Sequence, residues 1–320
     1  MPATTATAPG KCILIGEHAA VYARPAIAAP VTDVAVRATI SARPNAPSGE
    51  IKIEAPAVGL DARLSELPDD QPIAWIIHLV QRAIQVKRLP AMQIKITSTI
   101  PPAAGLGSSA AVAVALIRAL TQFLGYPLDE MTVCQLAYES EKRQHGSPSG
   151  VDNTVITYAR PIYFVKGQPF EALNVAEPVH LLIADSGQPS STAEVVADVR
   201  RGWEKSPAAF DAIFDAIGSL AQQARLCIEN GPAKSLGALL NQNHQLLQQL
   251  GVSNPKLDRL VEAAIEAGAL GGKLSGGGRG GNLIAQVEEA AADHVTNALL
   301  KTGAVRVIST TIHPNRNNLL

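Results

Sequence analysis

Alternating apolar and polar residues mark the first third of the chain as rich in strands. Residues 34–42 and 50–55 alternate with period two, and a turn containing Pro, Asn and Gly separates them, which predicts an antiparallel pair. The segment MQIKITST alternates in the same way. We therefore predict strands at residues 12–15, 34–42, 50–55 and 92–99, a loop at 59–72 and a helix at 73–86.

The second half of the chain has mostly helical spacing of its apolar residues. A helix is expected to begin at Ser190 or Ser191, with Glu194 at capping-box distance, and Pro or Asn-Pro opens several others. The pattern changes near residue 175, which predicts two domains, residues 1–175 and 176–320. Predicted helices are 110–123, 129–143 (with Asp129 as its cap), 207–230, 232–250, 255–267 and 288–300, and predicted strands are 161–165, 179–185, 283–287 and 304–310.

The segment IPPAAGLGSSAAVAVA, residues 100–115, has the composition of a phosphate-binding loop. Gly105 and Gly107 permit a tight turn, Ser108 or Ser109 can cap the helix that follows, and the N-terminus of that helix attracts anions. The alternative is a Gly-Ser turn that only caps a buried helix. The segment lacks the Lys of a Walker-type loop, so a cation for a bound nucleotide must come from elsewhere in the chain.

Three further clusters carry polar groups that could act in chemistry. Lys11, Glu17 and His18 flank the short strand 12–15, although each alone is more typical of a solvated loop or a satisfied core group. The polar segment HGSPSGVDN, residues 145–153, ends in Asp152, which could equally be a helix cap. KLSGGGRGGN, residues 273–282, is a second glycine cluster, and its place between a helix and a buried strand argues against a flexible linker.

Composition and charge argue against a nucleic-acid-binding protein and against a membrane protein. The 320 residues are 47% hydrophobic and 17% charged with a net charge of −1, so no basic face for nucleic acid and no polybasic membrane patch is expected. Apolar runs are too short to span a membrane and the N-terminus does not have the pattern of a signal peptide, which predicts a cytoplasmic protein. Cys12, Cys134 and Cys227 are far apart, which favours small buried apolar roles over disulfides or zinc.

Three motifs, in order and in spacing, resemble the GHMP kinases: APGKCILIGEHAAVY, PPAAGLGSSAA and KLSGGGRGG. Within that family, the pairing of GEHA with EKRQHGSPSGVDN is most similar to the enzymes that phosphorylate mevalonate. The resemblance runs over essentially the whole chain. It implies an α+β fold of two domains, with a left-handed βαβ unit in the N-terminal domain and a ferredoxin-like α/β sandwich in the C-terminal domain. A homodimer is also implied.

The same resemblance implies ATP-dependent phosphorylation of the 5-hydroxyl of (R)-mevalonate, a step of isoprenoid biosynthesis. Asp152 would accept the hydroxyl proton, Lys11 would stabilise the developing charge, and Glu141 with Ser108 or Ser109 would hold Mg²⁺. Glu17, His18, Ser149, Thr192 and Gly277 would line the acceptor site. ATP would lie on the loop formed by Pro102, Ala103, Ala104, Gly105, Leu106, Gly107, Ser108, Ser109 and Ala110.

One residue departs from the family pattern: Arg279 stands where relatives usually carry a small residue, and it could clamp phosphate or point to solvent. Other functions remain open. A sister kinase for phosphomevalonate, homoserine or a sugar is the nearest alternative, although a phosphorylated acceptor would need a basic cluster that the motifs lack. A decarboxylase relative would lack Lys11. A non-catalytic ligand sensor is the alternative from another class, and the presence of Lys11, Glu141 and Asp152 argues against it.

Overall fold

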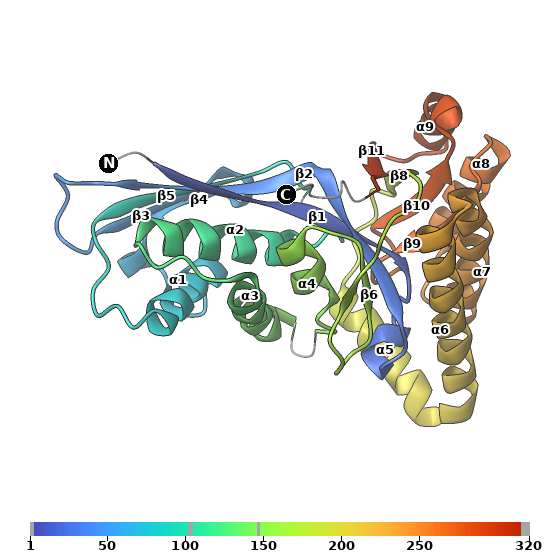
Figure 1. The fold of residues 1–320 in the computed structure, drawn as a ribbon, viewed down its shortest axis with the longest axis horizontal. Helices are drawn as coiled ribbons and strands as arrows, with labels where there is room; N and C mark the ends of the chain where they lie inside the picture. Colours follow the sequence, from blue (N-terminus) through green and yellow to red (C-terminus); the bar gives the residue numbers. More distant parts are fainter. Residues whose placement is uncertain (1–2, 102–104, 146–147, 315–320) are drawn as a thin grey trace. The chain divides into compact units, whose positions relative to one another are not determined.

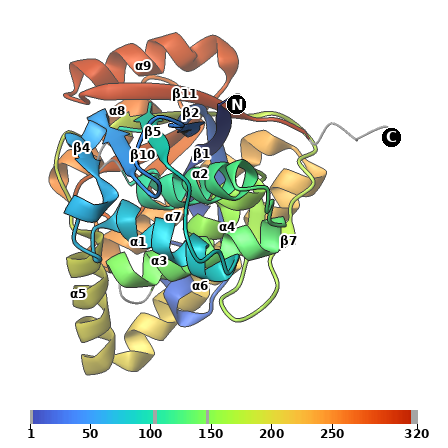
Figure 2. The same cartoon turned by 90° about the vertical axis from the view of Figure 1, so that its left-hand side faces the viewer.

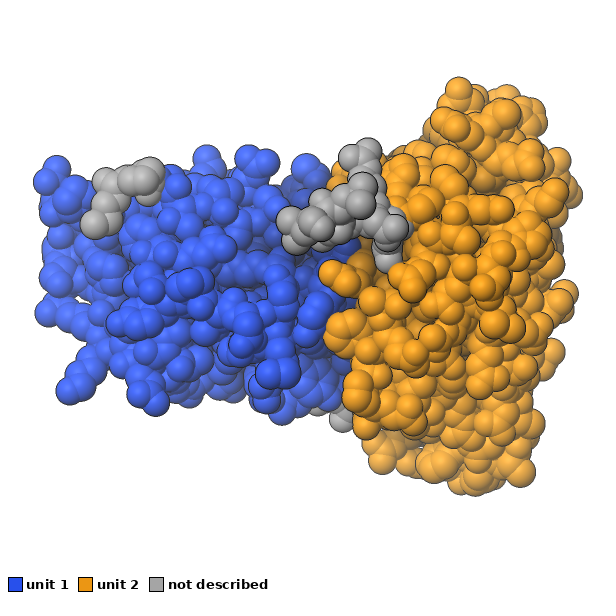
Figure 3. Space-filling view, viewed as in Figure 1, with its two compact units in different colours: residues 1–10, 34–102, 107–159 blue, residues 11–33, 103–106, 160–320 orange. Residues whose placement is uncertain are grey.

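The computed structural model describes residues 3–101, 105–145 and 148–314 (Figure 1). They form two compact units that interleave along the chain, unit 1 with residues 1–10, 34–102 and 107–159 and unit 2 with residues 11–33, 103–106 and 160–320 (Figure 3). The long strands β1 (Thr4–Ile15) and β2 (Ala26–Ala42) each contribute to both units. A single division of the chain after residue 175 remains a prediction.

Unit 1 is a sheet with helices packed on one face (Figures 1 and 2). β2 pairs antiparallel with β5, Val36 opposite Ser98, while β3 pairs parallel with β5. The chain between these parallel strands contains α1, so a strand–helix–strand connection is present, and its left hand stays a prediction. The elements of this unit are β3 (Ile51–Ala55), β4 (Leu60–Arg63), α1 (Pro72–Ala83), β5 (Met92–Ser98), α2 (Ser108–Phe123), α3 (Glu130–His145) and α4 (Val151–Tyr158), with 3-10 turns η2 (Pro56–Val58) and η3 (Leu64–Glu66).

Unit 2 is built on a four-stranded antiparallel sheet with the order β11-β8-β10-β9. The chain order of strand, helices, two strands, helix and strand is that of a ferredoxin-like sandwich, which confirms the expectation for the second half. Apolar side chains of β8, β10, α8 and α9, among them Leu182, Leu260, Leu283 and Val295, form its core. The elements are β8 (Val179–Asp185), α5 (Thr192–Lys205), α6 (Pro207–Asn230), α7 (Leu236–Gln249), α8 (Pro255–Glu266), β9 (Gly271–Ser275), β10 (Asn282–Val287), α9 (Ala292–Lys301) and β11 (Arg306–Ile312).

Smaller elements complete unit 2: η1 (Ala19–Tyr22), β6 (Ile162–Phe164), β7 (Glu171–Ala172), η4 (Ala233–Ser235) and η5 (Glu289–Ala291). β6 pairs with residues 26–28 of β2. Helix starts follow the caps expected from sequence: the Ser191 side chain accepts a hydrogen bond from the Glu194 backbone N–H, and the Asn254 side chain accepts one from Leu257 at 2.8 Å. No helix in the described part of the chain is both long and apolar enough to cross a membrane.

Four local expectations were wrong. The strands at 34–42 and 50–55 do not pair with each other, because β5 lies between β2 and β3 in the sheet. Residues 59–72 contain the short strand β4 and the 3-10 turn η3 rather than a loop alone. α4 begins at Val151, inside the segment expected to be a polar loop. Neither Ser108 nor Ser109 caps α2, because Gly107 is its N-cap and the two serines lie in its first turn.

Candidate active site

The first motif lies at the end of β1 in unit 2. Lys11 is 4% exposed, and its backbone N–H donates to the carbonyl of Leu106 at 3.0 Å, which places this strand beside the glycine loop of the second motif. The strand ends at Ile15, and the turn that follows carries Glu17 and His18, both buried. Lys11, Glu17 and His18 are therefore core groups of unit 2 and not solvated loop residues.

The third motif meets the first motif through hydrogen bonds of both side chain and backbone. The Ser275 hydroxyl accepts from the N–H of Ile13 at 3.2 Å and donates to the Ile13 carbonyl at 3.1 Å. His18 Nε2 lies 3.0 Å from the carbonyl oxygen of Gly277. Since a carbonyl only accepts, Nε2 carries the proton in this hydrogen bond.

Gly277 also lies against α5. A Cβ added to Gly277 would come within 2.9 Å of the Thr192 hydroxyl oxygen, so this position requires a glycine for close approach of the two segments. The loop of the second motif is near as well, because a Cβ on Gly276 would lie 3.9 Å from the carbonyl oxygen of Gly105. Parts of all three motifs thus meet within unit 2, although more than 250 residues of sequence separate the first from the third.

The glycine loop leads into α2 as the sequence predicted. Gly105 and Gly107 have φ angles of 67° and 72°, in the left-handed region that glycine adopts without strain. Gly107 and the first turn of α2, with Ser108, Ser109 and Ala110, belong to unit 1. Pro102, Ala103 and Ala104 lie outside the described residues.

The remaining predicted residues lie on α3, on α4 or just before α4, and these two helices pack against α2 and against each other in unit 1. Glu141 on α3 is 4% exposed, and Asp152 lies in the first turn of α4. The Ser149 hydroxyl, just before α4, accepts from the backbone N–H of Val151 at 3.3 Å.

Side chains hold α4 in place next to α3. Asn153 donates from Nδ2 to the carbonyl of Cys134 at 3.3 Å and to its sulfur at 3.2 Å. The Thr154 hydroxyl donates to the carbonyl of Gly150 at 2.7 Å. Arg118 of α2 donates to the carbonyl of Thr157 at 2.5 Å. The helix that carries Asp152 is therefore anchored to both of its neighbours. The contacts of Asn153, Cys134 and Arg118 could not be predicted from the sequence, because packing sets their partners.

Comparison with known proteins agrees with this arrangement. The family profile described as GHMP kinases N terminal domain matches residues 72–160, and the one described as GHMP kinases C terminal matches residues 224–305. A curated mevalonate kinase from Thermococcus sibiricus is 37% identical over 322 residues, which cover 95% of this chain and 95% of that protein. The chain belongs to the mevalonate kinase family of GHMP kinases.

Solved structures of this family resemble the fold over nearly its full length. The L. major mevalonate kinase in complex with R-mevalonate has a TM-score of 0.85 and 29% identity, covering 97% of this chain and 96% of that chain. The Methanococcus jannaschii mevalonate kinase has a TM-score of 0.84 and 27% identity, covering 98% and 99%. Membership of this family makes the protein an ATP-using kinase.

Burial sets the electrostatic character of this mevalonate kinase family member around its first motif. Burial lowers the pKa of His18 from its usual 6.5 to about 4, so the imidazole is neutral at pH 7 and acts as an N–H donor. Burial raises the pKa of the Cys12 thiol to about 12, which excludes a thiolate there. Cys12 is a small buried residue as expected, whereas Cys134 and Cys227 are only partly buried.

Arg279, the departure from the family pattern, is bound on its own unit. Its guanidinium forms an ion pair with Asp198 of α5 and donates from Nε to the carbonyl of Gly251 at 3.1 Å. The hydrogen bond to Arg279 lowers the pKa of the Asp198 carboxyl. The side chain is 41% exposed, and these contacts indicate that it holds the glycine cluster, residues 273–282, against α5.

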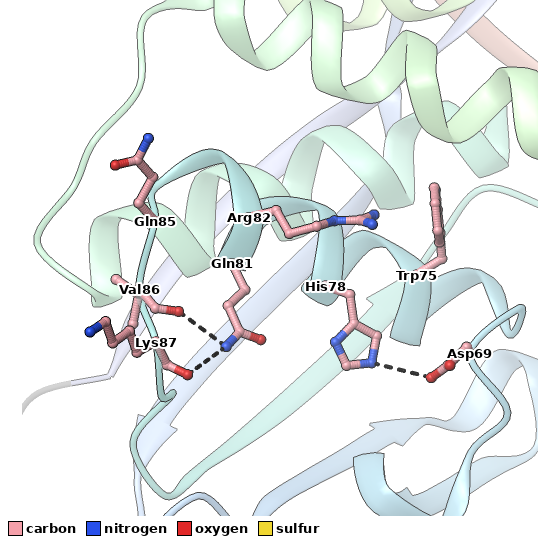
Figure 4. A pocket seen from close by; sticks show the side chains of 8 residues that line it. All are labelled: Asp69, Trp75, His78, Gln81, Arg82, Gln85, Val86 and Lys87. Atoms are coloured by element: carbon pink, nitrogen blue, oxygen red, sulfur yellow. Dashed lines mark hydrogen bonds and ion pairs between the residues drawn. The ribbon is translucent and has the colours of Figure 1, made fainter.

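A separate cavity of about 560 Å³ lies beside α1 in unit 1 (Figure 4). Gln81 donates across it to the carbonyl oxygens of Val86 and Lys87, and the Trp75 ring at its wall lies under the Arg82 guanidinium, 4.8 Å from the ring centroid. The described residues that line it include none of those predicted to act in catalysis. This cavity is therefore not part of the candidate active site.

Proposed function

We propose that this protein transfers the γ-phosphoryl group of ATP to the 5-hydroxyl of (R)-mevalonate and forms 5-phosphomevalonate, a step of isoprenoid biosynthesis. The observation that carries the proposal is the meeting of the three motifs in unit 2, where Lys11 bonds to Leu106 and Ile13 bonds to Ser275. These segments are far apart in sequence and carry the polar and glycine-rich residues of the three motifs, so their contact supports a shared ligand. Family membership supplies the class of acceptor.

The phosphates of ATP are assigned to the glycine loop and the start of α2. The first-turn N–H groups and the positive dipole end of this helix favour an anion, and the predicted loop runs from Pro102 to Ala110. Glu141 is a buried carboxylate on a helix that packs against α2, whose first turn offers the hydroxyls of Ser108 and Ser109. Hard oxygen ligands of this kind fit Mg²⁺, which usually takes one or two protein ligands and completes its shell with phosphate and water. When bound, Mg²⁺ would neutralise charge on the β- and γ-phosphates.

Asp152 is assigned as the base and Lys11 as the charge-stabilising cation. As the acceptor oxygen forms its bond to the γ-phosphorus, the bond from that phosphorus to the β,γ-bridging oxygen of ATP breaks. The hydroxyl proton passes to the Asp152 carboxylate, and ADP leaves. The position of Asp152 in the first turn of an anchored helix supports a fixed carboxylate.

The acceptor site is assigned to Glu17, His18, Ser149, Thr192 and Gly277. Four of them, all but Ser149, belong to unit 2, where the His18 ring bonds to Gly277 and Thr192 approaches the same glycine. A neutral His18 can orient a polar acceptor without adding a charge next to its carboxylate.

Turnover assays with several acceptors test this assignment. Purified protein is mixed with ATP, Mg²⁺ and mevalonate, and in parallel with phosphomevalonate, homoserine or galactose, while ADP release and the ³¹P spectrum of the product are followed. A 5-phosphate formed only from mevalonate is expected. Turnover of another acceptor would assign the chain to a sister kinase, and no turnover of any would favour the ligand sensor.

We further propose a homodimer, which the resemblance implies, and a cytoplasmic location, which the pattern of apolar residues predicts. Sedimentation equilibrium tests the first, with an expected mass of about twice the 33.5 kDa of the chain. A mass equal to one chain would remove it. Fractionation of the producing cells tests the second, and recovery of the protein in the membrane or secreted fraction would contradict it.

A further inference from the structure

A buried ion pair lies behind the first and third motifs in unit 2. The Lys273 side chain, on β9, is 0% exposed, and Glu17 is 1% exposed at the side chain. The Lys273 ammonium binds Glu17 Oε1 and donates to the carbonyl of Leu274 at 2.6 Å. The second carboxylate oxygen, Glu17 Oε2, accepts from Asn243 Nδ2 of α7 at 3.3 Å. Both oxygens of Glu17 are thus engaged within the protein.

Fold stability alone does not account for this pair. Removing two charges from water costs several kcal/mol per ion, and replacing a buried ion pair with apolar residues is often neutral or stabilising. Burial lowers the pKa of Lys273, and the neighbouring Glu17 carboxylate opposes that shift. A pair that is costly to bury is better explained by the position that it imposes on its neighbours.

Those neighbours are the contacts that join the two motifs. Glu17 precedes His18, whose Nε2 binds the Gly277 carbonyl, and Lys273 is two residues before Ser275, whose hydroxyl binds both backbone groups of Ile13. The ion pair is therefore a third link from the first motif to the third, in addition to these two direct hydrogen-bonded links. Loss of its charge would leave both links but remove the bond that sets their spacing.

We propose that Lys273 is a positioning residue for the acceptor site: with Asn243 it fixes the Glu17 carboxylate, and through it holds His18 and Gly277 in the arrangement that binds the acceptor. In this role Glu17 serves the site through its bonds to Lys273 and Asn243. The inference rests on the proposed acceptor site, and it assigns no contact between Lys273 and the substrate.

The test compares Lys273→Met, which removes the charge and keeps the unbranched stem, with Arg225→Met as a matched control. Arg225 forms ion pairs with Glu171 and Glu229 elsewhere in unit 2. For Lys273→Met, we expect the KM for the acceptor to rise about tenfold or more while the KM for ATP stays within about twofold. The control should change neither. If Glu17 instead acts by direct contact with the acceptor, its carboxylate is still present in Lys273→Met. The KM of this variant for the acceptor would then stay near that of the wild type.

Hydrogen exchange gives a second readout that does not depend on turnover. In Lys273→Met, amides of residues 17–20 and 276–278 should exchange faster than in the wild type and in the control. If this variant does not fold, Asn243→Ala takes its place, because it removes the second donor to Glu17 and keeps the ion pair; a rise of about threefold or more in acceptor KM is then expected.

Unchanged exchange in these segments, or an unchanged acceptor KM, would overturn the inference. The acceptor used is whichever one the wild type phosphorylates, so a failure of the mevalonate assignment does not affect the comparison. If the wild type phosphorylates none, the proposed function fails and the exchange measurement alone decides the positioning role.

Discussion

At the scale of single residues, Asp152 has the most direct consequence for catalysis. Asp152→Asn should keep ATP binding and lose about 10²-fold or more in kcat, because the amide cannot accept the hydroxyl proton. Steady-state kinetics together with a nucleotide-binding titration separate the two effects. Asp69→Asn is the control, since that carboxylate is 98% exposed and lies outside the proposed site. Turnover of Asp152→Asn near the wild-type rate would remove the base assignment.

His18 predicts a pH dependence of stability. Between about pH 6.5 and pH 4 the unfolded chain binds a proton at this residue that the folded protein excludes. The contribution of His18 to the free energy of unfolding is therefore complete above pH 6.5 and is lost as the pH falls towards 4. At about pH 5 the loss from this residue is about 2 kcal/mol. Urea unfolding at pH 7.5 and at pH 5 measures the loss in the free energy of unfolding between these two pH values. His18→Gln keeps an N–H donor but does not titrate, so its loss should be about 2 kcal/mol smaller than that of the wild type. Equal losses in both proteins would show that His18 titrates normally.

Arg279 should stabilise the glycine cluster and should not contribute to ATP binding. Arg279→Ala is expected to leave the KM for ATP within about twofold, because its guanidinium is bound to Asp198. Its φ of 55° adds a second expectation: Arg279→Gly should melt at a higher temperature than Arg279→Ala, since glycine adopts this φ without strain. A KM for ATP raised well beyond twofold in both variants would instead identify a phosphate clamp.

At the scale of elements, the two ends of α2 offer a matched pair of substitutions. Gly107 precedes the helix with φ 72° and Gly125 follows it with φ 80°. Replacing either with Ala forces a left-handed conformation that costs about 1 kcal/mol. Only Gly107→Ala should raise the KM for ATP, because only that end of the helix faces the proposed phosphate site. Thermal melts and ATP kinetics on both variants check this. Equal KM values for ATP in the two variants would show that the glycine loop does not bind ATP.

Sequence periodicity predicted most elements and missed those whose stability comes from neighbours. The segment VDNTVITY of α4 is rich in β-branched residues, which favour strands, yet it is helical because it packs on α2 and α3. The strand β4, LDAR, alternates apolar and polar residues, but it is only four residues long, none of them is buried, and it is held by pairing with β3. β9 begins with two glycines, which weaken a strand signal even though all five of its residues are buried.

The site was predictable where a motif is contiguous and not where a bond joins distant residues. The glycine loop and the turn at Glu17 and His18 could be found from local composition. The pairing of Glu17 with Lys273 could not, because 256 positions separate them and each looks like an ordinary charged residue in sequence. Asn243 is likewise one polar residue among several on its helix until the fold brings it to Glu17.

At the scale of the whole molecule, the predicted C-terminal domain can be tested as a fragment. Residues 176–320 lack Glu17 and Ile13, so Lys273 would be buried without its counter-ion and Ser275 without its backbone partner. We expect this fragment to be unfolded or loosely packed, with no cooperative thermal transition by circular dichroism. A cooperative transition would show that the division at residue 175 separates domains that fold independently.

The interleaving of the two units also sets an order of events on the ribosome. Unit 1 ends at residue 159, whereas unit 2 combines residues 11–33 with residues 160–320. The growing chain can therefore complete unit 1 while the segment 11–33 has already emerged and still lacks its partners in residues 160–320. That segment carries the buried residues Glu17 and His18 and the apolar end of β1, and it must wait for almost the entire polypeptide to be synthesised. During this interval, chaperones that shield exposed apolar segments would have their clearest target in residues 11–33.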